Sequence, residues 1–359
     1  MKEVKGELVN LNGELFYKIS NSDKMRPFFM SIVSDSNHWM FISSNGGLTA
    51  GRINAESSLF PYYTDDKINE MVETTGCKTI FQVIKDGNTK IWEPFSMRQM
   101  GIYKTESNLY KNIYGNKIVF EEKNIDLDLI YRYEWNSSDK FGFVKKSTLI
   151  NESDDTVKVR VLDGVQNILP SNVTSDLQNG RSNLVDAYKR SELKEEVGLG
   201  IYALSAVIVD KAEPSESLKA NIVWSTGIDN ATYLLSSLQL DSFRRGETVM
   251  QEVDVKAEKG AYFVSTDIEI SAGSKEGWMF MMNVNQSISD VVEISELIKS
   301  ENNIQQLIKE NIDLGKKKLV ELTAASDGLQ LTEDPLINMR HFSNTLFNIM
   351  RGGIFDDAY

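Results

Sequence analysis

The sequence predicts a mainly β protein, a large antiparallel β-sandwich whose only long helices come near the C-terminus. Many short apolar segments between about residues 4 and 290 are separated by short polar turns, which favours packed antiparallel sheets over β-α-β units. Two of these turns, Asn12-Gly13 and Asp86-Gly87, have the sequence of two-residue hairpins. Near Ser289 the apolar spacing changes to that of an α-helix. We therefore expect two packed sheets followed by helices.

Length, charge and cysteine content limit the possible classes of protein. With 359 residues, the chain exceeds the roughly 200–250 residues of a large sheet domain, so a smaller second part is expected. The single cysteine, Cys77, excludes an internal disulfide and fits a reducing, cytoplasmic location. No apolar run suggests a signal peptide or a membrane span. The net charge of −13 argues against nucleic-acid binding.

The first expected hairpin joins residues 8–11 to 15–17, and the second joins 80–84 to 90–92. Residues 167–198 contain Pro170, Asn179-Gly180 and a charged run. They are expected to leave the sheet as a long excursion with a short helix at 184–193. Further strands are expected at 117–120, 127–135, 141–150, 157–162, 205–209, 220–224, 250–255, 261–270 and 278–284.

Two helical segments are expected after the last strand. The first begins at Ser289 or Asp290, either of which could cap it. The second begins at Asp334-Pro335, an N-cap acceptor followed by proline, and ends at Arg351-Gly352-Gly353. Its apolar stripe consists of Met339, Phe342, Leu346 and Ile349. This predicts a β-sandwich domain over 1–288, a helical linker over 289–333, and the start of a further domain over 334–359.

The stretch 39–67 is the most distinctive, because an apolar strand runs into a polar glycine turn and then into an aromatic cluster. The turn contains Asn45, Gly46 and Gly47. It lacks the Gly-Lys-Ser/Thr ending of a phosphate loop, so nucleotide binding is not expected. His38, His341 and Cys77 show no metal-ligand spacing, and no G-x-S-x-G motif is present. No cofactor, metal or nucleophilic triad is therefore expected.

Aromatic side chains mixed with polar loop residues are typical of carbohydrate sites, because ring faces stack on sugars while amides and carboxylates bind hydroxyls. Trp39, Tyr62, Tyr63 and Trp92 fit this chemistry. The alternative for each is a place in the core of the sandwich, and the sequence leaves both interpretations open.

Several motifs together resemble the N-terminal part of the cellobiose-phosphorylase-like family. The segment Phe41–Thr49, FISSNGGLT, resembles an early strand and glycine turn of that family, except that Leu48 stands where an aromatic residue is usual. Residues 91–95, IWEPF, resemble its tryptophan-x-proline segment, and residues 145–160 resemble a strand pair joined at an asparagine turn. Residues 351–355, RGGIF, are similar to the 1,2-β-oligoglucan phosphorylase branch.

The resemblance implies a β-supersandwich, a helical linker and the first helix of an (α/α)6 barrel. It implies inverting phosphorolysis of a β-linked oligosaccharide, with inorganic phosphate as co-substrate and a catalytic aspartic acid in the barrel. The chain would then be a non-catalytic segment whose partners are the sugar, phosphate, the remainder of its own chain and a second copy in a homodimer. No catalytic residue is named. The other hypothesis is a free-standing carbohydrate-binding β-sandwich.

On this basis the expected substrate-binding residues form two groups. Asn45, Gly46, Gly47, Tyr62 and Tyr63 are expected at the end of the sandwich that faces the barrel, because loops at a sheet end commonly hold ligands. The second group, expected at the mouth of the barrel, consists of Arg351, Asp356 and Asp357. The alternative for the second group is a helix C-cap followed by a solvated acidic tail.

Overall fold

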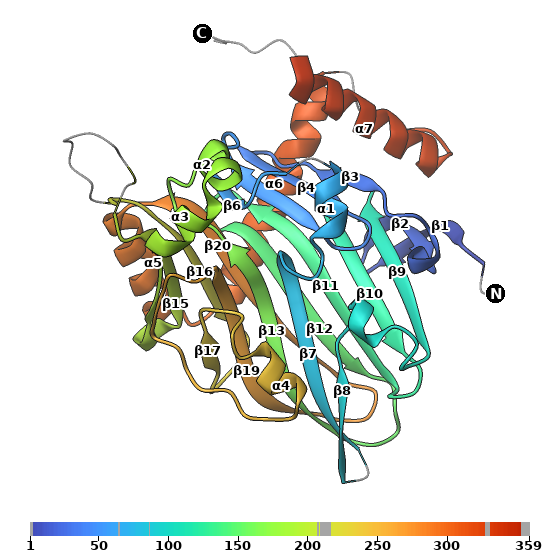
Figure 1. Cartoon of the computed structure of the whole chain (residues 1–359). Helices are drawn as coiled ribbons and strands as arrows, with labels where there is room; N and C mark the ends of the chain where they lie inside the picture. Colours follow the sequence, from blue (N-terminus) through green and yellow to red (C-terminus); the bar gives the residue numbers. More distant parts are fainter. Residues whose placement is uncertain are drawn as a thin grey trace.

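Three antiparallel sheets form the body of the molecule (Figure 1). The computed structural model describes residues 3–63, 65–85, 87–206, 208, 217–326 and 331–352. The largest sheet has eleven strands, the second five and the third four. The two larger sheets pack face to face, as the sequence predicts for a mainly β sandwich, and the four-stranded sheet lies at one end.

Within the two larger sheets, the spatial order of the strands differs from their order along the chain. The eleven-stranded sheet contains, from edge to edge, β1 (Lys5–Leu11), β2 (Glu14–Ser20), β9 (Thr105–Asn112), β10 (Ile118–Asn124), β11 (Leu129–Ser138), β12 (Gly142–Asn151), β20 (Lys275–Gln286), β16 (Ala220–Thr226), β15 (Leu199–Leu204), β14 (Lys189–Lys194) and β18 (Asp254–Lys256). The five-stranded sheet contains β17 (Thr232–Leu234), β19 (Gly260–Ile270), β13 (Val157–Ile168), β7 (Gly76–Lys85) and β8 (Asn88–Trp92). The four-stranded sheet contains β3 (Phe29–Ile32), β4 (His38–Ser43), β5 (Leu48–Arg52) and β6 (Ser58–Phe60).

Both predicted hairpins are present, as β1–β2 and β7–β8. The segment resembling a strand pair, 145–160, instead crosses between sheets, because β12 belongs to the eleven-stranded sheet and β13 to the five-stranded one. Asn151 fixes this crossover. Its amide donates to the carbonyl oxygens of Asp155 and Ile270 at 2.7 and 3.0 Å, and its own oxygen accepts from the backbone of Ser153.

The sequence-based prediction of two sheets misses the four-stranded one. The inner face of that sheet, with Met40 and Ile42, closes one end of the main core. Residues 205, 206 and 208 of the expected strand 205–209 are not in a strand, because β15 ends at Leu204, and residues 207 and 209 lie outside the described residues. Of the expected strand 250–255, only residues 254 and 255 pair, as part of β18. The helix expected at 184–193 stops at Tyr188. The next six residues form β14 because their side chains alternate between buried and half-buried positions beside β15.

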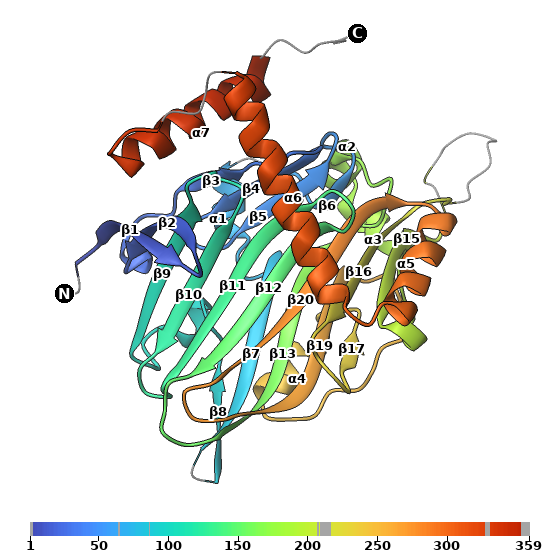
Figure 2. The same ribbon diagram turned by 180° about the vertical axis from the view of Figure 1, so that it is seen from behind.

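The described helices are α1 (Asp65–Glu70), α2 (Ser175–Gly180), α3 (Ser182–Tyr188), α4 (Leu240–Arg244), α5 (Ile288–Ser300), α6 (Ile304–Ala325) and α7 (Pro335–Gly352). Helix α5 is capped by Ser287 rather than by Ser289 or Asp290. Ser287 and Asp290 form a reciprocal capping box, so Asp290 is its third helical residue. Helix α6 crosses the outer face of the eleven-stranded sheet (Figure 2).

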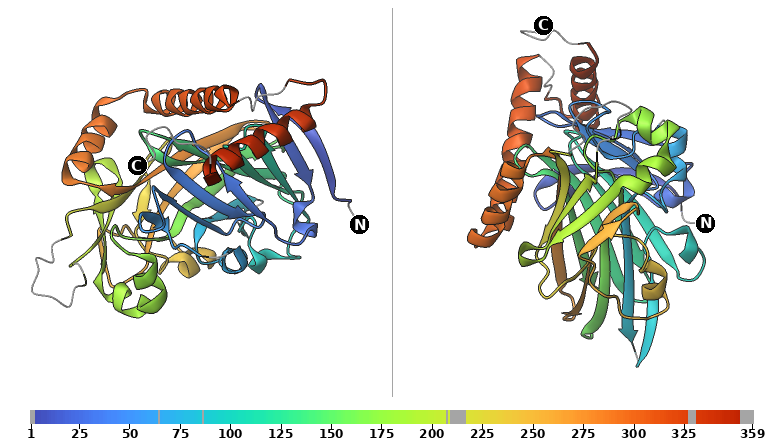
Figure 3. Two further views of the ribbon diagram at one scale, coloured as in Figure 1. Left: turned by 90° about the horizontal axis from the view of Figure 1, so that it is seen from above. Right: turned by 60° about the vertical axis from the view of Figure 1, so that its left-hand side comes forward.

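Helix α7 begins at Pro335, as predicted, because the Asp334 carboxylate accepts from the backbone N–H of Leu336 at 2.9 Å. It lies at the same end of the molecule as the four-stranded sheet (Figures 1 and 3). Phe342 anchors it, buried against Tyr114, Leu319 and Val33. Within the described ranges, no helix is long and apolar enough to cross a membrane.

Candidate functional site

The predicted site turn, Asn45–Gly47, is held by backbone contacts to α1. The amide of Asn45 donates to the carbonyl oxygen of Asn69 at 2.8 Å, and its oxygen accepts from the Gly47 N–H at 3.2 Å. A Cβ on Gly47 would lie 2.0 Å from the carbonyl oxygen of Ile68. The Asn45 side chain and the lack of one at Gly47 are therefore explained by the packing of the turn under α1.

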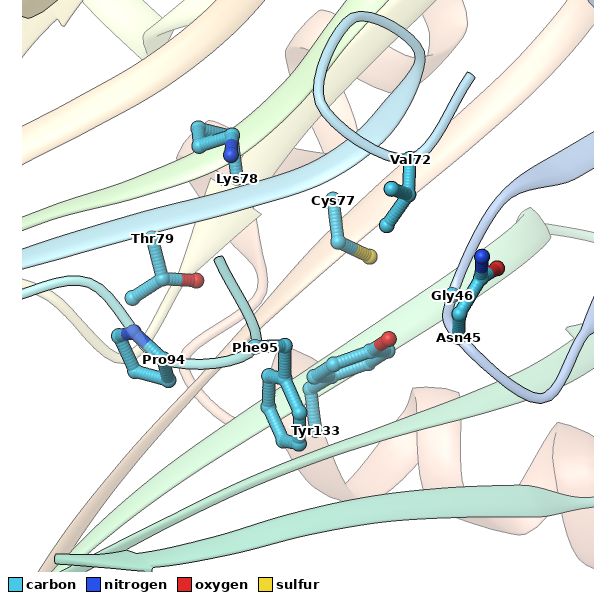
Figure 4. Close-up of a pocket in the computed structure, with 9 residues that line it drawn as sticks. All are labelled: Asn45, Gly46, Val72, Cys77, Lys78, Thr79, Pro94, Phe95 and Tyr133. Atoms are coloured by element: carbon cyan, nitrogen blue, oxygen red, sulfur yellow. The ribbon is translucent and has the colours of Figure 1, made fainter. Parts of the chain in front are cut away.

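A small cavity lies beside this turn, lined by Asn45, Gly46, Cys77 and Tyr133 among others (Figure 4). Its volume is about 20 Å³, and a single water molecule needs roughly 10–15 Å³. A sugar ring does not fit. Cys77 is not a reactive group here, because burial raises the pKa of its thiol to about 12.

Trp92, a predicted sugar-stacking residue, lies in the core instead. Its indole N–H donates to the Glu122 carboxylate at 2.9 Å, and the same carboxylate accepts from the backbone N–H of Phe95 at 2.9 Å. Burial raises the pKa of Glu122 above its ordinary value. The IWEPF segment thus joins the two larger sheets, and Trp92 is not available to a ligand.

The structure brings Tyr62 and Trp39 together on the outer face of the four-stranded sheet, with ring centroids 5.6 Å apart in an edge-to-face arrangement. Tyr62 is 40% exposed. The neighbouring Tyr63 is half-buried, and the ammonium group of Lys67 lies 5.8 Å from the centre of its ring. Tyr62 is one of the five residues predicted around this turn. Its side chain is therefore open to a ligand and packs on a second aromatic ring.

Two phenylalanines extend this pair into a continuous row. Phe41 lies 6.1 Å from Trp39, and Phe29 stacks on Phe41 at 5.3 Å with 43% of its side chain exposed. We call Phe29, Phe41, Trp39 and Tyr62 the aromatic row. Neither phenylalanine is predicted as a site residue from the sequence. The alternation in His38–Ser43 does place Trp39 and Phe41 on one face, opposite Met40 and Ile42.

Trp39 lies against the sheet because residue 51 is a glycine. A Cβ at Gly51 would be 2.4 Å from Cζ2 of Trp39, so any side chain there would displace the indole. The indole N–H also donates to the carbonyl oxygen of Asn54 at 3.0 Å. With both one ring face and its N–H fixed, Trp39 is held in one orientation, as a stacking platform requires.

For the second predicted group, the structure describes the backbone of Arg351 alone. Arg351 lies in the last turn of α7, and its side chain is outside the described part of the structure. Asp356 and Asp357 lie outside the described residues. Their roles remain predictions.

The most extensive polar cluster in the core surrounds Asp163. Its carboxylate accepts hydrogen bonds from Thr79, Tyr131, Lys145, Ser147 and Trp278 at 2.6–3.2 Å. Asp163 and Lys145 are fully buried, so these groups hold the two larger sheets together and do not meet a substrate. In the part of the chain that the structure describes, no three His, Cys, Asp or Glu residues are grouped to hold a metal ion.

No protein-family model matches the chain, and no curated protein matches its sequence. Among solved structures, the chain is similar to a bacterial glucoamylase complexed with acarbose, with a TM-score of 0.46, 10% identity, and 91% of this chain and 41% of the other covered. A kojibiose phosphorylase from the human microbiome gives a TM-score of 0.42, 10% identity, and coverage of 88% and 39%. An aldose 1-epimerase from Klebsiella pneumoniae gives a TM-score of 0.38 and 10% identity, and the match covers 82% of this chain and 91% of the other.

The β-sandwich is thus similar to parts of a glycoside hydrolase and a glycoside phosphorylase. The chain spans about two fifths of the length of the glucoamylase and of the kojibiose phosphorylase. With TM-scores below 0.5, these similarities assign no activity or substrate to this chain.

Proposed function

We propose that this chain is the N-terminal, non-catalytic β-sandwich of an inverting β-glucoside phosphorylase, and that the aromatic row binds a β-linked glucose oligosaccharide. The observation that carries the binding part is the row itself. Four rings lie within 6.1 Å of their neighbours on one sheet face, and the two end rings are more than a third exposed. Contiguous exposed apolar surface of this kind marks an interaction site.

The phosphorylase part is supported by the motifs at 41–49, 91–95, 145–160 and 351–355, and by the order of a sandwich followed by helices. This part of the proposal rests on the sequence resemblance. It assigns no residue of this chain to protonate the leaving oxygen. Inorganic phosphate would be the co-substrate of the whole enzyme. This chain by itself is expected to release no sugar 1-phosphate from sophorose, cellobiose or longer β-glucans.

The alternative, a free-standing carbohydrate-binding sandwich, would use the same aromatic row. Helix α7 packs on the body of the molecule through Phe342, while Ile337, on another side of the helix, remains 49% exposed. The reading frame after Tyr359 separates the two hypotheses. A long continuation with helical periodicity supports the phosphorylase, and a stop codon supports the free-standing sandwich.

The binding experiment titrates the purified chain with sophorose and cellobiose in a calorimeter. Trp39→Ala and Tyr62→Ala should each weaken binding about two- to twelvefold, in keeping with a loss of roughly 0.5–1.5 kcal/mol per aromatic contact. Met100→Ala removes an exposed apolar side chain elsewhere and is the control. Equal affinities for the parent chain, Trp39→Ala and Tyr62→Ala would contradict a binding role for the row.

A further inference from the structure

A second cavity lies on the outer face of the eleven-stranded sheet, under helix α5. Its volume is about 120 Å³, roughly ten times what a single water molecule needs. Strands β16 and β20, the β11–β12 turn and α5 contribute its walls. Different residues form the aromatic row, which lies on the four-stranded sheet.

The floor of this cavity is aromatic and its far wall aliphatic. Trp224 and Phe141 meet edge to face, with centroids 6.2 Å apart and planes at 67°. Ile294 and Leu297 project from α5 into the same cavity. Trp224 and Phe141 are each only 2% exposed. The cavity therefore has a closely packed apolar floor and an aliphatic wall.

The rim carries both donors and acceptors of hydrogen bonds. The Asn283 oxygen already accepts from the Arg52 guanidinium at 3.1 Å, which leaves its NH₂ group as a donor. The Gln286 NH₂ group donates to the Val284 carbonyl oxygen at 2.8 Å, which leaves its own oxygen as an acceptor. Lys140 and Glu293 add an exposed ammonium and an exposed carboxylate.

We propose that this cavity is a binding site for one pyranose unit of a neutral carbohydrate. The apolar lining suits the C–H side of a sugar, and the mixture of donors and acceptors suits its hydroxyls. A purely apolar ligand would bury the rim groups without partners, which is unfavourable. An anion would approach the carboxylates of Asp290 and Glu293, which also line the cavity.

The test uses the chain labelled with 5-fluorotryptophan and titrated with glucose, cellobiose and sophorose up to about 50 mM, a range that detects millimolar binding. Five tryptophans give five fluorine signals, assigned by substituting each with phenylalanine. We expect a saturable shift of the Trp224 signal with all three sugars. Trp92, Trp135 and Trp278 do not line the cavity and should not respond. The Trp39 signal reports on the aromatic row, so the same titration tests the two proposed binding sites separately.

Glu293→Gln should weaken the response of Trp224 to glucose at least threefold, because it removes a charged acceptor from the rim. Glu296→Gln changes an exposed carboxylate three residues further along the same helix that does not line the cavity; it is the matched control and should leave the affinity unchanged. A Trp224 signal that does not move, that moves together with those of Trp92, Trp135 and Trp278, or that responds equally in the parent chain and Glu293→Gln would overturn the proposal.

Discussion

The ammonium group of Lys145 donates a 2.6 Å hydrogen bond to the carboxylate of Asp163, and neither side chain is exposed to solvent. The pair joins strand β12 of the eleven-stranded sheet to β13 of the five-stranded sheet. The Lys145 ammonium also lies 4.9 Å from the centre of the Phe280 ring. An ion pair at this depth fixes how the two sheets face each other, because either charge alone would be costly to bury.

Asp163→Asn should lower the free energy of unfolding by about 3–5 kcal/mol, since it leaves the Lys145 charge buried without its counter-ion. Urea denaturation followed by tryptophan fluorescence measures this. The control is Glu269→Gln, which breaks the Lys158–Glu269 pair on strands β13 and β19, where both side chains are more than 60% exposed. That change should cost less than about 1 kcal/mol. Similar losses in the two variants would contradict a special role for the buried pair.

His38 should make stability depend on pH below neutrality. Burial, and then the nearby Arg52 charge, lower the pKa of its imidazole to about 3, whereas the unfolded chain titrates near 6.5. Between these values the unfolded state takes up a proton that the folded state does not, so stability falls as the pH falls. At pH 5 the loss relative to pH 7 should be about 2 kcal/mol greater in the parent chain than in His38→Gln.

Urea denaturation at pH 7 and pH 5 gives this difference, and the carboxylates that titrate in the same range contribute equally to both proteins. The Ser36 hydroxyl, 2.7 Å from Nδ1 of His38, also remains in both. Parallel pH dependences of the parent chain and His38→Gln would show that the imidazole is protonated in the folded state.

Gly47→Ala should destabilise the protein by about 1–3 kcal/mol, because the new methyl group would lie 2.0 Å from the carbonyl oxygen of Ile68. The melting temperature measures the effect. Gly180→Ala is the control, since no atom lies within 4 Å of the position its Cβ would take, and it should stay within about 0.5 kcal/mol of the parent. Unchanged stability of Gly47→Ala would contradict the packing explanation, and the glycine would then be needed for ligand binding instead.

Phe342→Ala should release α7 from the sandwich without unfolding it. The ring is 3% exposed and lies 5.4 Å from Tyr114, and it supplies the anchoring contact of this helix. Hydrogen exchange of the α7 amides should accelerate while that of β11 and β12 stays slow. Ile337→Ala, on an exposed side of the same helix, should change neither rate. Uniformly faster exchange in Phe342→Ala would mean that α7 unfolds together with the sandwich.

Local signals in the sequence determined the elements that depend on neighbouring residues. Asn12-Gly13 produced the β1–β2 hairpin because few residues other than glycine and asparagine adopt the positive φ angles that such a turn needs. Asp334-Pro335 set the start of α7 because an N-cap acceptor and a fixed proline φ act within one turn. The mainly β class and the helical C-terminal part follow from the same kind of local pattern.

Tertiary structure alone decided which aromatic residues are exposed. In His38–Ser43 the alternation separates Trp39 and Phe41 from Met40 and Ile42, but both faces are apolar, so the pattern does not say which one is inward. Likewise, Trp39 and Trp92 are both tryptophans in similar strands. Only the packing of the three sheets buries Trp92. The aromatic row exists because β3, β4 and the segment after β6 become neighbours in space. Burial depends on contacts between residues far apart in the chain, which a local pattern does not contain.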